Sequence, residues 1–267
     1  MIQGSTRLPK MLGFLIKKAF FDTWDNLFRV LLLNIGFYAP VALLVYAPVI
    51  APLLPLTLAL QVVALACFCV YTGGASAVAS AIADYQSPGF ALFWDAVRDT
   101  YRTTLLFALV NGVYFVILQV AIRVYAQVDQ PVLGMMGQII LLWVTVGWVL
   151  AAQFFFPIQS RLERKPRKMV RKMLLLFFDN TGLMLVLAVG ALAILLASLF
   201  TGGILPGLGA ILVWHNVALK LRLYKYDYLE QHPDADRKEI PWDALLVDDR
   251  DRVGKRTLRG MIFPWKE

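Results

Sequence analysis

Long apolar stretches separated by short polar or charged segments dominate the chain. A transmembrane helix needs about 20 mainly apolar residues, and six stretches are of this order. They run from about 27 to 46, 53 to 83, 103 to 122, 132 to 158, 181 to 200 and 204 to 219. The pattern predicts an all-α polytopic membrane protein whose six spans form three helical hairpins. Gly73-Gly74 is expected to break the second span, which is longer than a bilayer core requires.

The polar flanks divide the chain into three parts. Residues 1–26 mix Phe20, Phe21 and Trp24 with charged side chains, which predicts an amphipathic helix along the inner leaflet. Residues 27–226 form the six-span domain, and residues 227–267 form a charged cytoplasmic tail.

Composition supports a place in the membrane. The 267 residues are 59% hydrophobic and only 16% charged, and the mean hydropathy is +0.65. Soluble domains carry roughly 25% charged residues, so this apolar excess cannot fit inside a soluble core. Two cysteines exclude a disulfide scaffold.

The distribution of charge predicts the topology. The net charge is +8, and 17 of the 18 Lys and Arg residues in positions 1–226 fall on one side of the predicted spans. Cytoplasmic loops carry this excess, so both termini are expected in the cytoplasm, with the chain in the cytoplasmic (inner) membrane. The basic charge is therefore a topology signal, and nucleic-acid binding is not expected.

The loop between the fourth and fifth spans is the most basic segment. Such a loop suits anionic lipid headgroups at the inner leaflet, although it could also serve only to set topology. The seven candidates for headgroup binding are Arg161, Arg164, Lys165, Arg167, Lys168, Arg171 and Lys172.

A short internal repeat precedes two of the spans. Asp22-Thr23-Trp24 and Asp99-Thr100-Tyr101 are each followed by an asparagine 12 residues after the aspartate, at Asn34 and Asn111. Two matches of this length could arise by chance, but they agree with hairpins that each begin at the cytoplasmic side.

Several local features together resemble a known family. They are Trp24 to Leu27 before the first span, Thr72 to Ala77 in the second, Phe93 to Asp99 before the third and Phe156 to Ile158 after the fourth. Over about residues 14–226 this order resembles the YesL-like family of bacterial membrane proteins, a family of unknown function. The resemblance implies a multi-span protein of the bacterial cytoplasmic membrane, in a family sometimes associated with carbohydrate-uptake systems.

Few polar side chains interrupt the spans. Asn34, Asn111 and His215 are candidates for a substrate site between the hairpins, and the alternative is hydrogen bonding between helices. Cys67 and Cys69 lie about 200° apart around a helix, so they cannot hold a metal ion together. We expect no metal site, no cofactor and no catalytic residues.

The tail carries apolar anchors among its charges. They are Trp242, Leu245 and Leu246, followed by Phe263 and Trp265. Such residues either dock on the cytoplasmic face of the same chain or bind a protein partner.

These features favour a non-enzymatic accessory or scaffold component of a membrane complex or transport system. The alternative is a transporter of a small solute or lipid with a site between the hairpins. An enzyme is disfavoured because the sequence brings together no nucleophile, metal set or acid/base pair.

Overall fold

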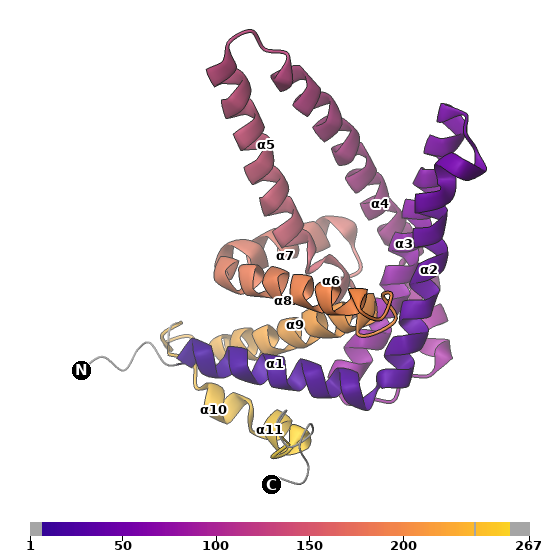
Figure 1. Ribbon diagram of the computed structural model, residues 1–267. Helices are drawn as coiled ribbons and strands as arrows, with labels where there is room; N and C mark the ends of the chain where they lie inside the picture. Colours follow the sequence, from indigo (N-terminus) through magenta and orange to yellow (C-terminus); the bar gives the residue numbers. More distant parts are fainter. Residues whose placement is uncertain (1–6, 238, 257–267) are drawn as a thin grey trace.

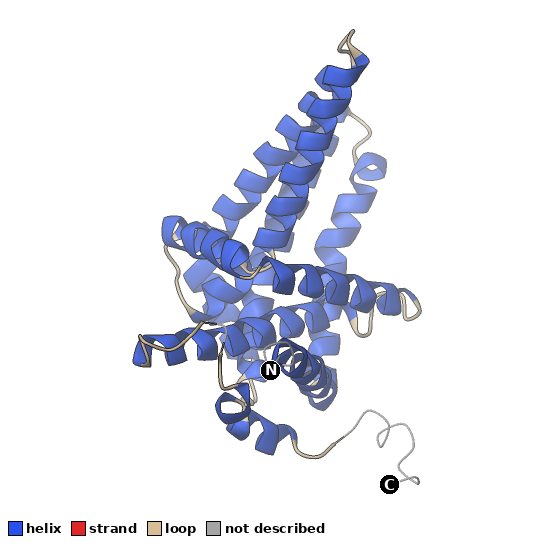
Figure 2. Ribbon diagram, turned by 90° about the vertical axis from the view of Figure 1, so that its left-hand side faces the viewer, coloured by secondary structure: helices blue, strands red, loops and turns tan. Residues whose placement is uncertain are grey.

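The computed structural model describes residues 7–237 and 239–256, and these residues contain helices but no strand (Figures 1 and 2). The helices are α1 (Arg7–Asp25), α2 (Leu27–Ile50), α3 (Leu54–Ala83), α4 (Phe90–Ala126), α5 (Pro131–Ala152), α6 (Phe155–Arg161), α7 (Pro166–Asp179), α8 (Thr181–Leu199), α9 (Gly207–Gln231), α10 (Trp242–Leu245) and α11 (Val247–Val253). The all-α fold class is confirmed.

Five helical stretches are long and apolar enough to cross a membrane. They are Leu27–Ile50, Leu54–Ala83, Phe90–Ala126, Pro131–Arg161 and Thr181–Leu199. These match the first five predicted spans. The sixth prediction falls in α9, which does not meet the same requirements.

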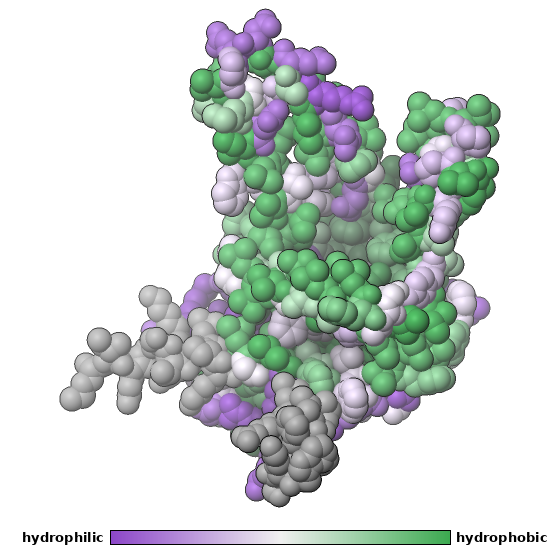
Figure 3. All heavy atoms as spheres, in the orientation of Figure 1, coloured by the Kyte–Doolittle hydropathy of each residue, from purple (hydrophilic) through white to green (hydrophobic). Residues whose placement is uncertain are grey.

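Two helical hairpins extend from a common base. In Figure 1 the pair α2 and α3 and the pair α4 and α5 point upward as two arms, while α1, α8 and α9 run across the base. Apolar surface covers both arms between polar patches at the α4–α5 tip and at the base (Figure 3). Apolar surface between polar ends is typical of a protein that spans a membrane.

Helix α9 forms the centre of the base rather than an isolated span. It packs against α1, α2, α3 and α8, and Val213, Val217 and Leu219 are fully buried. The polar groups His215 and Asn216 are buried with them. The sequence shows only that α9 is partly apolar. The structure shows that other helices of the chain pack against it on several sides.

The two glycines of α3 allow close packing instead of breaking the helix. Helix α3 continues through Gly73 and Gly74, so the expected break is wrong. A Cβ atom on Gly74 would lie 2.7 Å from Val97 and 2.8 Å from Phe93, both on α4. A side chain at this position would force the two helices apart, which explains why glycine occupies it.

The described part of the tail lies against its own bundle. Trp242, Leu246 and Val253 are buried in the same apolar core as α1 and α9. Leu245 packs on this core and is partly buried. This is the self-docking alternative, whereas Phe263 and Trp265 lie outside the described residues.

Candidate functional site

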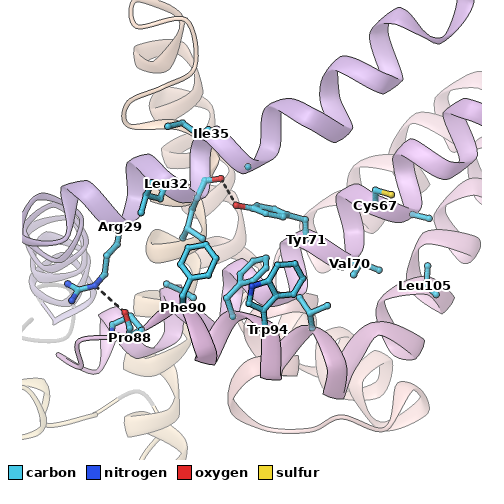
Figure 4. A pocket seen from close by; sticks show the side chains of 17 residues that line it. Arg29, Leu32, Ile35, Cys67, Val70, Tyr71, Pro88, Phe90, Trp94 and Leu105 are labelled. Carbon is cyan, nitrogen blue, oxygen red and sulfur yellow. Dashed lines mark hydrogen bonds between the residues drawn. The ribbon is translucent and has the colours of Figure 1, made fainter. Parts of the chain in front are cut away.

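An apolar groove lies between α2, α3 and α4, at the junction of the two arms. Its volume is about 550 Å³. The side chains in Figure 4 reach it from all three helices and from the α3–α4 loop. The lining consists of Arg29, Leu32, Leu33, Ile35, Gly36, Ala66, Cys67, Val70, Tyr71, Val78, Pro88, Gly89, Phe90, Phe93, Trp94, Val97 and Leu105.

Tyr71 shapes the middle of the groove. Its hydroxyl donates a hydrogen bond of 3.0 Å to the carbonyl of Leu33 (Figure 4). Its ring packs against Phe37 and Phe93. A Cβ atom on Gly36 would lie 1.9 Å from the Tyr71 oxygen. The glycine therefore makes room for the tyrosine, which ties α3 to α2 beside the groove.

Arg29 is the one charged residue in the groove lining. Its Nε donates to the carbonyl of Pro88 at 3.2 Å (Figure 4). Its Nη1 donates to Oδ1 of Asn26 at 2.7 Å. No carboxylate in the described part of the chain forms an ion pair with it. Both observed acceptors are neutral, so they orient the guanidinium without cancelling its charge. The groove thus combines an apolar surface with a free positive charge.

A buried ionic cluster joins the N-terminal helix to the tail. Lys18 is fully buried, and its Nζ lies 2.8 Å from Asp22 and 3.8 Å from Asp249. Nζ also lies 3.6 Å from the centre of the Tyr85 ring. Burial raises the pKa of Asp22 to about 6, against the opposing effect of Lys18, and burial lowers the pKa of Lys18.

The same cluster continues into α3, α6 and α9. Lys220 Nζ lies 3.1 Å from Asp249 and 3.4 Å from Asp84, and Arg161 donates to Asp84 at 2.8 Å. Opposite charges therefore alternate through five helices or helix ends. We call Lys18, Asp22, Asp84, Arg161, Lys220 and Asp249 the ionic cluster. No local sequence pattern predicts it, because its members are up to 231 residues apart.

The three polar candidates in the predicted spans do not meet at one site. Asn34 contacts the turn before α9, where its Nδ2 donates to Ile204 and Pro206. Asn111 accepts from Trp148 on α5 at 3.0 Å. His215 is buried in α9, and its Nε2 has no hydrogen-bond partner among the described residues. The two asparagines therefore bond between elements, as the packing alternative expects.

Most of the basic loop is exposed, and three of its basic residues form ion pairs, including Lys168 with Glu163 at 3.8 Å. Arg161 belongs to the ionic cluster, and Arg164 forms an exposed ion pair of 2.8 Å with Asp99. Lys165, Arg167, Lys168 and Arg171 are exposed and Lys172 is half-buried, while Met169, Met173 and Leu176 bury the other face of α7. Headgroup binding by the exposed residues stays a prediction.

No protein-family model, curated protein or solved structure matches the chain. The resemblance to the YesL-like family therefore stays a prediction. Functional inference rests on the fold and on the geometry of the groove, the ionic cluster and the surfaces around them.

Proposed function

We propose that this chain is an integral protein of the cytoplasmic membrane with both termini in the cytoplasm. The five apolar helices support a multi-pass protein. The one-sided distribution of Lys and Arg supports the orientation. We further propose that the C-terminal end of α8 contacts lipid, because Leu199 and Phe200 are 70% and 94% exposed there.

Within that membrane, we propose that the chain holds an anionic phospholipid of the inner leaflet without transforming it. The observation that carries this proposal is the groove, whose apolar lining includes one unpaired cation. Acyl chains match the lining of α2, α3 and α4, and a guanidinium binds phosphate through charge-assisted hydrogen bonds. Arg29 lies in the first turn of α2, at the end where the chain leaves the inner leaflet.

A groove-filling variant and a charge variant test this function separately. Val70→Trp should reduce the phospholipid retained through purification, because the indole occupies groove volume. Arg29→Gln should weaken retention of anionic phospholipid by about tenfold, the equivalent of one charge-assisted hydrogen bond, and should spare zwitterionic phospholipid. Native mass spectrometry after exchange into defined lipid mixtures measures both effects.

The matched control is Val116→Trp, which adds the same side chain to a 61% exposed position on α4 outside the groove lining. It should retain lipid as the wild type does. Equal retention by all four proteins would contradict the proposal, as would a wild type without preference for anionic phospholipid.

A second candidate function is the accessory or scaffold role, which the docked tail favours. The ionic cluster fixes α11 to α1 and α9, so the docked tail forms part of a defined surface on the cytoplasmic side. Cross-linking in intact membranes tests it: Phe263→Ala/Trp265→Ala should lose a partner that the wild type captures. These substitutions leave the docking residue Trp242 in place. Unchanged cross-links would remove the partner role from these two residues.

A further inference from the structure

Three glutamines on the two arms have no hydrogen-bond partner. The helices α2, α3, α4 and α5 carry five side-chain amides, those of Asn34, Gln61, Asn111, Gln119 and Gln138. The two asparagines hydrogen-bond to other elements. The three glutamine side chains form no hydrogen bond among the described residues, and two of them, Gln119 and Gln138, are exposed. We call Gln61, Gln119 and Gln138 the amide triad.

The amide triad lies at a similar distance from the tip of each arm. Gln119 is seven residues from the C-terminal end of α4. Gln61 and Gln138 are each seven residues from the N-terminal ends of α3 and α5. At 1.5 Å per residue, each amide is about 10 Å from the end of its helix. All three therefore lie within helices apolar enough to cross a membrane, where lipid tails offer no hydrogen bond.

Two members of the triad lie on the facing sides of the two arms. A Cβ atom on Gly112 of α4 would lie 3.9 Å from the side chain of Leu65 on α3, so these positions mark the faces that meet. Toward the tips, Gln61 lies one turn from Leu65, and Gln119 lies two turns from Gly112, each on the same helix face. The outer ends of the arms stand apart (Figures 1 and 3), so both amides border the space between the arms.

Gln138 brings a second amide to the α4–α5 hairpin. It lies two turns from Thr145, on the face of α5 that is turned toward α4. The Thr145 hydroxyl lies 2.8 Å from that of Tyr114, which belongs to α4. The hairpin therefore carries one unpaired amide on each of its helices, at the same distance from the tip.

The chemistry of an amide favours a second amide as its partner. A polar side chain in hydrocarbon gains from hydrogen bonds to another membrane helix. A glutamine amide has two N–H donors and one carbonyl acceptor, so it complements an identical amide. A two-fold axis between two copies of one chain brings identical side chains together. A second copy of this chain thus supplies the partners that lipid lacks.

We propose that the chain forms a symmetric dimer in the membrane, in which the α4–α5 hairpin of each copy lies between the arms of the other. Gln119 and Gln138 would then pair with the amide triad of the second copy, and Gln61 would contribute from the opposite arm. Phe115 and Leu142, one turn away and 59% and 60% exposed, would be covered in the same interface. The triad lies outside the groove lining, so this proposal does not rest on phospholipid binding.

Fluorescence resonance energy transfer between full-length copies tests the dimer. Copies that carry donor or acceptor fluorescent proteins at the N-terminus are placed in phosphatidylcholine and phosphatidylglycerol vesicles and diluted with lipid. Wild-type copies should show transfer that falls on dilution. Gln119→Leu and Gln138→Leu should each raise the apparent dissociation constant about tenfold, because each substitution removes an amide from both copies. Gln61→Leu should act in the same direction.

The matched control is Gln127→Leu, the same substitution at an exposed residue that ends α4 at the hairpin tip, outside the triad. It should associate as the wild type does. Leucine favours a membrane helix, so the triad variants should keep the circular dichroism spectrum of the wild type. The proposal is overturned if the wild type is monomeric in the vesicles, or if the three triad variants associate like the control.

Discussion

Lys18→Met is expected to lower the free energy of unfolding by about 3–5 kcal/mol, the usual cost of removing one partner from a buried ion pair. Lys18 is fully buried and neutralises Asp22 at 2.8 Å. It also faces Asp249 at 3.8 Å. Methionine fills similar space but leaves the Asp22 carboxylate buried without its nearest cation, so the loss comes from uncompensated charge rather than from lost volume.

The loss should depend on pH. The pKa of folded Asp22 is about 6, above the unfolded value near 3.8, and removing Lys18 raises it further. A raised folded pKa contributes stability at low pH that is lost as the pH rises through that pKa. The difference between variant and wild type should therefore be largest above pH 6 and should shrink on acidification.

Thermal and denaturant unfolding in detergent, followed by near-ultraviolet circular dichroism, measures this effect. The matched control is Arg98→Met, which breaks an ion pair of 3.9 Å that is 79% exposed at the arginine, and it should change stability by less than about 0.5 kcal/mol. Lys18→Met/Asp22→Asn should recover part of the loss. A Lys18→Met protein as stable as the control would contradict the role given to the ionic cluster.

Asn34→Ala is expected to cost about 2–4 kcal/mol, because three backbone groups lose their partner. The Asn34 Nδ2 donates to the carbonyls of Ile204 at 2.7 Å and Pro206 at 2.8 Å. Its Oδ1 accepts from the backbone N–H of Gly209 at 2.7 Å. One side chain on α2 therefore holds both the turn before α9 and the first turn of that helix.

Asn111→Ala is the control for Asn34→Ala. Asn111 is half-buried, and it bonds to a carbonyl of its own helix and to Trp148. Its loss should cost about 1 kcal/mol, the usual net value of one hydrogen bond. Unfolding by denaturant in the same detergent ranks the two variants. If Asn34→Ala were no more destabilised than Asn111→Ala, the hydrogen bonds of Asn34 to α9 and to the turn before it would not be important for stability.

The two asparagines share a sequence pattern but not a structural role. The Asp-to-Asn spacing does not distinguish Asn34 from Asn111, since both follow an aspartate by 12 residues. The structure gives Asn34 a turn 170 residues away and Asn111 a neighbouring helix. Spacing along the chain placed both residues in apolar helices, but their partners depend on which helices pack together.

The candidate sites show the same division. Asp99 and Thr100 of the short repeat line a cavity between α3, α4 and α6, together with Gly73, Ala77 and Ala81, which recur at intervals of four on α3. Neither pattern indicates a cavity, because a cavity exists only where α3, α4 and α6 fail to fill the space between them. The apolar groove was missed for the same reason: its lining residues resemble any other apolar positions in a span.

The sequence by itself determined that the chain is helical and where its five long apolar helices lie. These are local properties, because a helix satisfies its own backbone and a window of about 20 residues decides its solubility in hydrocarbon. Only the tertiary structure decided that α9 is buried at the base, that Lys18 meets Asp249, and that an apolar groove lies between α2, α3 and α4. Those features depend on side chains brought together across the whole chain, and packing and charge pairing among distant residues leave no signal in a local window.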